Sequence, residues 1–216
     1  MANGHLHKQL LLTSIIAAVI CCFSVQCHAQ EYKFPEPALT YPLGPATDTV
    51  RICILGDMMM HSAQIENASS CTSEYDFSSY FHFLEDKIKD ADIAIANMEY
   101  TLAGKPYTGY PAFSAPEAYA TYLAELGIDV FLTANNHIFD KGGKGAERTL
   151  DMYRNMKDIR FTGLASGEEE REETNPLFVQ KKGIRTALIN FTYGTNMGSG
   201  THWPKVNYMA NRDFLR

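Results

Sequence analysis

The sequence has few cysteines, and most of them lie near its start. Of five cysteines in 216 residues, three fall before residue 28, which leaves Cys53 and Cys71. No paired CxxC motif is present, so the sequence does not support a zinc site built from cysteines. Cys53 lies in a β-branched apolar run and is best interpreted as a small core residue, while its pairing with Cys71 in an oxidising compartment stays an open alternative.

Basic charge is also scarce. The chain has 19 Lys and Arg residues against 25 Asp and Glu residues, a net charge of -6, and no run of basic residues. Nucleic-acid-binding domains carry a basic face, so we expect no nucleic acid partner. The longest charge run, residues 168–173, is acidic and predicts a solvated loop. No nucleophile elbow is present either, which argues against a serine hydrolase.

Only one long apolar run occurs, at residues 10–23. It is shorter than the ~20 residues that a membrane-spanning helix needs. The compact residues that follow it suit signal-peptidase cleavage after Ala29, so residues 1–29 are typical of a secretory signal peptide. We therefore expect an exported protein of the periplasm or cell surface.

A lipid anchor is the weaker alternative, because Ile20 and Gln26, which precede cysteines, are not the small residues of a lipoprotein signal. Residues 30–49 contain four prolines and predict an extended linker. The folded domain then spans residues 50–216. Its content of 45% hydrophobic and 20% charged residues, over the whole chain, is globular.

Apolar periodicity predicts alternating strands and helices in this domain. Expected strands cover residues 50–55, 92–97, 129–134 and 159–164, with a hairpin of residues 177–181 and 184–191 turned around Gly183; expected helices cover residues 77–89, 116–126 and 145–156. Alternation of this kind favours an α/β fold with crossover connections. The chain stops soon after a strand and a polar loop, so we expect the domain to be incomplete at its C-terminus.

Polar residues follow three of these strands, at Asp57, at Asn97 to Glu99, and at residues 135–137. Ligands of open α/β sheets bind beyond the carboxyl ends of the strands. Carboxylate, amide and imidazole groups meeting there suit Mn²⁺, Mg²⁺, Fe²⁺ or Zn²⁺, and a shared carboxylate could bridge two such ions.

Each cluster also has a structural interpretation. Asp57 could cap a following helix, and Asn97 and Glu99 could be turn residues. The segment Asn135-Asn136-His137 is more specific, because three polar residues directly after a buried strand are unfavourable unless something binds them. The glycine-rich residues 141–145 could hold an anion at a helix N-terminus, but they lack the Walker A spacing, so a flexible helix start is favoured.

Five phrases of the sequence resemble the CapA family, named for poly-γ-glutamate capsule synthesis. They are GDMMMHS (56–62), ANMEYTLAG (96–104), YPAFSAPE (110–117), LTANNHIFDKGGKGAERTLD (132–151) and FTGLASGEEE (161–170), with KKGIRTALINFTYGTN (181–196) continuing the match. The family is similar to calcineurin-like metallophosphatases. The resemblance implies a four-layer α/β/β/α sandwich and a centre of one or two divalent metal ions.

Carried over residue by residue, the resemblance implies Asp57, Glu99 and Asn136 as metal ligands. It implies that His137 contacts the reacting group, or protonates the leaving group, rather than holding metal. Asp140 is expected to orient that imidazole, since a carboxylate partner fixes the tautomer and raises basicity. Its alternative role is to cap the following helix.

The sequence departs from the metallophosphatase pattern at two places. Met59 stands where many members have a histidine, and His61, two residues later, does not fit that role. The downstream histidine motifs are missing, and we interpret His202 as a surface residue rather than one of them.

These observations predict an exported CapA-like protein of capsule or cell-envelope polymer synthesis with a metal-dependent phosphoesterase-like site. Its expected partners are a polyanionic envelope polymer or phosphorylated substrate and a membrane-associated synthesis complex. The alternatives are a non-catalytic scaffold that tethers a polymer, and a periplasmic phosphoesterase with small substrates.

Overall fold

The computed structural model describes residues 39–40, 49–69, 75–198 and 202–211. The chain divides into two compact units, residues 1–34 and 35–216, and the description below concerns the second. The expected signal peptide, nearly all of the linker and Cys71 lie outside the described residues. In the part of the chain that is described, no helix is long and apolar enough to cross a membrane.

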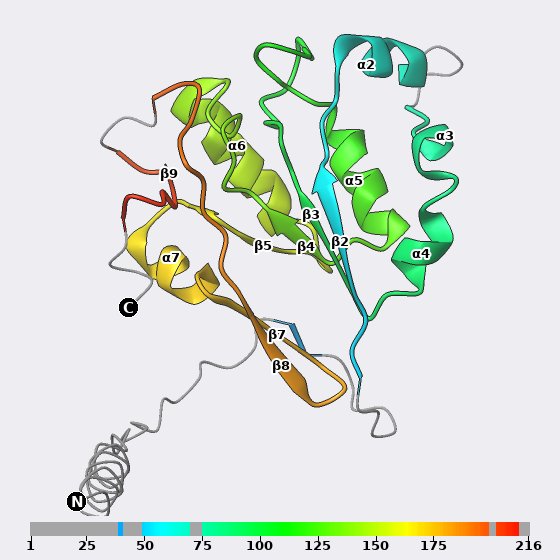
Figure 1. Ribbon diagram of the computed structural model, residues 1–216. Coiled ribbons are helices and arrows are strands. Elements are labelled where there is room, and N and C mark those ends of the chain that lie inside the picture. Colours follow the sequence, from blue (N-terminus) through cyan, green and yellow to red (C-terminus); the bar gives the residue numbers. More distant parts are fainter. Residues whose placement is uncertain (1–38, 41–48, 70–74, 199–201, 212–216) are drawn as a thin grey trace, which may run out of the picture. The chain divides into compact units, whose positions relative to one another are not determined.

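A four-stranded parallel sheet forms the centre of this unit (Figure 1). Its strands are β2 (Ile52–Asp57), β3 (Ile93–Asn97), β4 (Val130–Leu132) and β5 (Arg160–Thr162), in that order. Helices connect the strands, so the predicted α/β class with crossover connections is confirmed. β3 is apolar and buried along residues 93–96, as expected for a central parallel strand with both faces covered.

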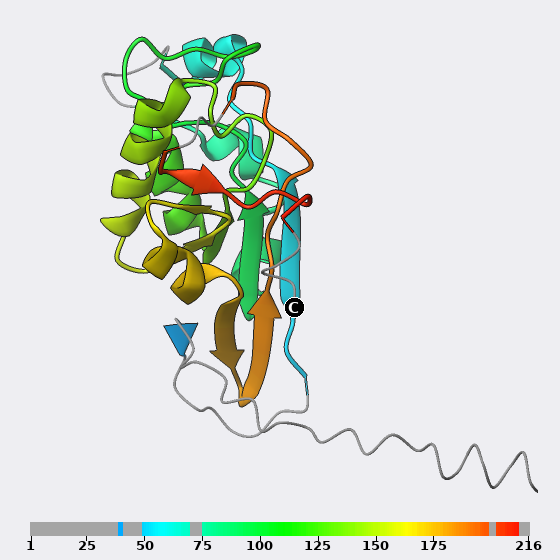
Figure 2. The ribbon, with the colours of Figure 1, turned by 90° about the vertical axis from the view of Figure 1, so that its left-hand side faces the viewer.

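Helices cover one face of this sheet, as Figure 2 shows with α6 to the left of β2 and β3. They are α2 (Ser62–Ser69), α3 (Ser78–Phe81), α4 (Glu85–Lys89), α5 (Glu117–Leu126) and α6 (Gly142–Arg154). Ala94 and Ala96 of β3 face them in one core cluster with Leu123 and Leu150. α5 ends at Gly127 in the left-handed region, with φ of 110°, as its glycine stop predicted.

The prediction of a single helix over residues 77–89 is wrong. Residues 82–84 form a turn that separates α3 from α4. The periodicity placed Leu84 on the inner face, but its side chain is 42% exposed, so the apolar pattern joined two short helices.

The opposite face of the parallel sheet carries a second sheet, of order β1-β7-β8. β1 is Leu39–Thr40, and β7 (Leu177–Lys181) and β8 (Ile184–Leu188) form the predicted antiparallel hairpin. Lys182 and Gly183 make its turn, with φ of 52° and 80°. Leu177 and Val179 of β7 join Ile93 and Ile95 of β3 in a separate core cluster, so the two sheets pack face to face.

The acidic run at residues 168–173 is a helix rather than the expected loop. It forms most of α7 (Glu168–Thr174). Glu170 accepts hydrogen bonds from the Ser166 backbone and from Arg154, which lies on α6. This tertiary ion pair fixes the helix start, which the local charge pattern did not indicate.

The expected strand at residues 159–164 breaks at Gly163. β5 ends at Thr162, and Leu164–Ala165 (β6) pairs with Lys205–Val206 (β9) instead. Gly163 has φ of 116°, and a Cβ there would lie 2.2 Å from Asn190 Oδ1 and 2.5 Å from the Ala134 nitrogen. Asn190 Oδ1 accepts a hydrogen bond from that nitrogen at 2.7 Å. A glycine is therefore required where the C-terminal segment meets the end of β4.

The substitution Gly163→Ala is expected to lower the free energy of unfolding by about 2–5 kcal/mol, because it adds left-handed strain of roughly 1–2 kcal/mol to overpacking of roughly 1–3 kcal/mol. Gly183→Ala is the matched control: its φ is also positive, but no atom lies within 4 Å of the added Cβ. Gly183→Ala should lower the free energy of unfolding only by the contribution of the backbone strain. Urea unfolding measures both, and equal losses would contradict the steric account.

Candidate metal centre

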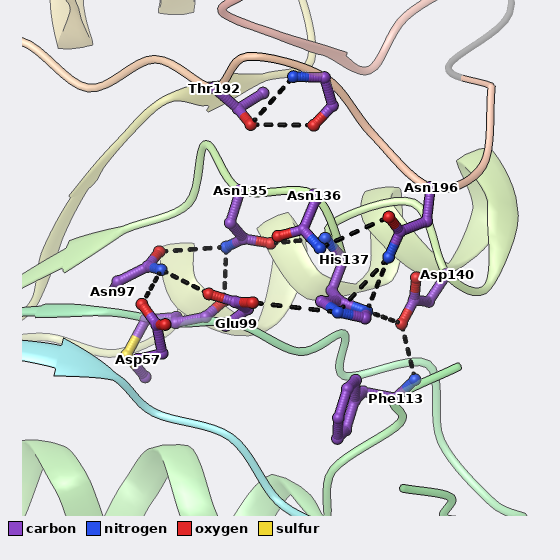
Figure 3. A network of polar contacts seen from close by, with 12 residues as sticks. Asp57, Asn97, Glu99, Phe113, Asn135, Asn136, His137, Asp140, Thr192 and Asn196 are labelled. Carbon is purple, nitrogen blue, oxygen red and sulfur yellow. Dashed lines mark hydrogen bonds and ion pairs between the residues drawn. The ribbon is translucent and has the colours of Figure 1, made fainter. Parts of the chain in front are cut away.

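Three chain segments meet at the carboxyl edge of the parallel sheet (Figure 3). Asp57 ends β2, Asn97 ends β3, and residues 135–137 follow β4. The strand register pairs Asp57 with Asn97, with an irregularity between Leu55 and Asp57. The expected convergence of polar groups at the strand ends is therefore present in the structure.

Asn97 links the two carboxylates of this edge. Its Nδ2 donates to Asp57 Oδ1 at 2.7 Å and to Glu99 Oε2 at 2.9 Å. Asp57 is exposed, whereas Glu99 is only 9% exposed. Among the described residues, no salt bridge joins either carboxylate to a lysine or arginine. Two negative charges thus share a single neutral amide donor.

This arrangement changes the acidity of Glu99. Burial raises the pKa of Glu99 above its ordinary value, and the negative charge of Asp57 raises it further. His137 and the hydrogen bond from Asn97 oppose the shift without cancelling it. The ionised form of Glu99 is therefore the costly form in the folded protein when no cation is bound.

His137 lies on the other side of Glu99, with Nε2 3.9 Å from Glu99 Oε1. Its Nδ1 lies 2.7 Å from Asp140 Oδ2, and the same oxygen accepts the Phe113 backbone N–H at 2.7 Å. The Phe113 ring meets the imidazole edge to face, with centroids 4.8 Å apart. The imidazole is buried and its orientation is fixed on two sides.

Asp140 contacts His137 and does not cap the following helix. α6 is preceded by Lys141, and no side chain caps its first turn. With Nδ1–H donated to Asp140, Nε2 is the nitrogen that lies toward Glu99. The role of this pair in a reaction stays a prediction.

Asn135 and Asn136 point to different partners. Asn135 Nδ2 donates to the Met98 carbonyl at 2.9 Å and to Asn97 Oδ1 at 3.3 Å, which ties the β4 turn to β3. Asn136 makes no hydrogen bond to Asp57 or Glu99; its Nδ2 lies 3.4 Å from Asn196 Oδ1. Its role as a metal ligand stays a prediction.

Asn196 is a site residue that sequence reasoning missed. Its backbone N–H donates to the Asn136 carbonyl at 2.8 Å, and its Nδ2 lies 3.2 Å from His137 Nδ1 and 3.4 Å from Nε2. It reaches the site because Asn190 and Asn207 tie the C-terminal segment to the end of β4 and to Gly163. Its only sequence signal was the closing residue of the phrase at residues 181–196.

The other histidines in the described part of the chain lie outside this network. His61 is exposed, and its ring packs edge to face on Phe113 at 5.1 Å. His202 is exposed, as interpreted from the sequence. Cys53, half-buried beside the helical core, is a free thiol.

The residues present fit a hard divalent cation in part. Carboxylate and amide oxygens are the ligands that such ions prefer. Asp57 and Glu99 supply concentrated, unbalanced negative charge. Within the described ranges, no group of three or more His, Cys, Asp and Glu side chains could hold an ion, so amide oxygens would have to complete the ligand set.

Comparison with known proteins gives the chain a family. A family model described as "Bacterial capsule synthesis protein PGA_cap" matches residues 51–214. The "Capsule biosynthesis protein CapA" of Bacillus anthracis is 26% identical over 153 residues. That match covers 67% of this chain and 35% of the relative, so the chain spans about a third of that protein.

The pKa shift of Glu99 predicts a pH-dependent effect of Glu99→Gln in the presence of a chelator. A raised carboxyl pKa stabilises the fold below the unfolded pKa, and this contribution is lost as pH rises through the folded value. Glu99→Gln should therefore gain stability relative to the unmodified protein from pH 4 to pH 7. Urea unfolding at both pH values measures this, with the exposed Glu66→Gln as control. The same pH dependence in both variants would contradict the shift.

Proposed function

We propose that this chain, which belongs to the family of bacterial capsule synthesis proteins, is exported and acts on an anionic envelope polymer or phosphorylated substrate at a divalent-metal site. One observation carries the proposal: among the residues that the structure describes, Asp57 and Glu99 meet without a lysine or arginine partner, beside an imidazole that Asp140 orients. An anionic substrate would be repelled by these carboxylates alone, so a cation is needed between them and the substrate.

The fold proposed for the domain is the four-layer α/β/β/α sandwich of the metallophosphatase type. Helices, a parallel sheet and a second sheet follow one another in the described residues. The candidate site lies at the carboxyl ends of the parallel strands, where such a fold would hold its ligands. These features support the proposal.

In the proposed mechanism, Asp57 and Glu99 would hold the ion, and the amide oxygen of Asn136 would add to the ligand set. A bound divalent ion would polarise a phosphoryl or carbonyl oxygen and lower the pKa of a coordinated water. Asn97 keeps the two carboxylates together. The imidazole of His137, when protonated, delivers a proton from Nε2 to the leaving oxygen or stabilises its charge, while Asp140 holds Nδ1–H.

The proposed setting is the periplasm or cell surface, in a membrane-associated synthesis complex. Support comes from the apolar segment at residues 10–23, the proline-containing residues 30–49 and the family's capsule role. The name of the Bacillus anthracis relative refers to capsule biosynthesis. A non-catalytic scaffold of the same fold is the alternative, and metal binding with hydrolysis separates the two.

Two substitutions should divide the site into a metal-holding part and a proton-transferring part. Asp57→Asn is expected to weaken Mn²⁺ binding at least about tenfold, because it removes a charged ligand. His137→Ala should leave Mn²⁺ binding within about threefold but lower hydrolysis of a phosphodiester by ~10²–10⁴. Equilibrium dialysis and release of nitrophenol from bis(4-nitrophenyl) phosphate measure the two effects.

The exposed His82→Ala is the matched histidine control and should change neither quantity. Asn136→Ala tests the remaining predicted ligand by the same dialysis. If metal binding and hydrolysis both survive Asn136→Ala and His137→Ala, the enzymatic proposal is wrong. Metal binding with no hydrolysis in the unmodified protein would favour the scaffold.

A further inference from the structure

A hollow lined by basic side chains lies beside the candidate metal centre, at the start of α6. Its volume is about 370 Å³, and its walls are the loop at residues 103–106, Ser114 and the first turns of α6. Four cationic side chains line this basic hollow, and no Asp or Glu does: Lys105, Lys141, Lys144 and Arg148. On a chain of net charge -6, this is a local reversal of sign.

The arginine of the basic hollow already has partners. Arg148 pairs with Glu117 Oε1 at 2.6 Å and donates to the Leu102 carbonyl. Burial raises the pKa of Glu117, but hydrogen bonds from Tyr107 and Arg148 outweigh it and hold the pKa below its ordinary value. Glu117 is therefore ionised near neutral pH and balances Arg148.

The three lysines have no such balance. In the described part of the chain, the ammonium groups of Lys105, Lys141 and Lys144 form no salt bridge, and that of Lys105 lies 5.9 Å from the centre of the Tyr107 ring. Three like charges around one concavity repel one another, and the positive end of the α6 dipole adds to the same potential. A bound anion would relieve this repulsion, which is the reason to assign the hollow a ligand.

The shape of the basic hollow depends on a close approach of α6 to the preceding loop. A Cβ at Gly145 would lie 2.5 Å from the Lys141 Cβ and 3.3 Å from the Ala103 Cβ. Gly104, with φ of 86°, brings the loop backbone against the Arg148 guanidinium. Glycine at both positions lets the walls meet, so the hollow is formed before any ligand arrives.

The hollow and the candidate metal centre are built from neighbouring residues of the chain. Lys141 directly follows Asp140, and Ser114 directly follows Phe113, the two residues that fix the His137 imidazole. The lysines present separate ammonium groups, which act as point charges rather than as a bidentate fork. This arrangement suits several charges spaced along an extended ligand.

We propose that the basic hollow binds carboxylate or phosphate groups of an extended polyanion. The binding requires no metal at Asp57. The role of this binding is to place a substrate at His137, and that role rests on the function proposed above. The ligand then spans from the lysines at the start of α6 to the buried imidazole, and the acidic edge of the sheet lies beyond it.

The test compares two double variants that each remove two lysine charges. Lys141→Gln with Lys144→Gln should weaken binding of a fluorescent deca-glutamate roughly tenfold, as expected for two exposed ion pairs. Lys87→Gln with Lys157→Gln, on surfaces away from the hollow, should change it less than twofold. Fluorescence anisotropy at low salt with a chelator present measures both, and thermal unfolding checks that each variant folds.

Equal weakening in both double variants, or none in the first, would overturn the proposal. Polyphosphate in place of deca-glutamate distinguishes the two anion chemistries, and binding of either through Lys141 and Lys144 supports the site. Inorganic phosphate competing as strongly as the polymers would overturn an extended ligand. Asp57→Asn separates the two proposals: polymer binding that is retained while Mn²⁺ binding is lost supports the hollow, and its loss would place the polymer at the metal site.

Discussion

The side-chain amide of Asn97 holds the carboxyl edge of the parallel sheet together. Its nitrogen donates to Asp57 at the end of β2 and to Glu99, and its oxygen accepts from Asn135 after β4. One neutral group thus joins three chain segments that the parallel register brings side by side. Without it, two carboxylates would face each other with no amide donor between them, and the side-chain nitrogen of Asn135 would keep only its bond to the Met98 carbonyl.

The sheet and most of its helices could be predicted, because their sequence signals are local. The buried apolar run of β3, the glycine after α5 and the turn at Gly183 each encode an element within a few residues. The failures at residues 82–84 and 168–173 have tertiary causes. Leu84 is exposed although periodicity placed it inside, and α7 depends on an ion pair between Glu170 and Arg154.

The part of the candidate site that lies at the strand ends could also be predicted from the sequence. The carboxyl ends of parallel strands lie at one edge of a sheet, so the sequence alone predicts that Asp57, Glu99 and His137 converge. Asn196 could not, because its position depends on a long segment whose path is set by Asn190 and Asn207. The hydrogen bond from Phe113 to Asp140 could not be predicted for another reason. Its donor is a backbone N–H, so no residue type in the sequence indicates it.

Asp140 has a consequence that reaches beyond the imidazole. A single oxygen lies within hydrogen-bond distance of the His137 ring nitrogen and accepts the Phe113 backbone N–H, and the next residue in that loop, Ser114, lines the basic hollow. The loop and the imidazole therefore share one acceptor. A ligand that displaces the loop would also disturb the contact that orients His137, which would couple binding in the hollow to the geometry of the candidate metal centre.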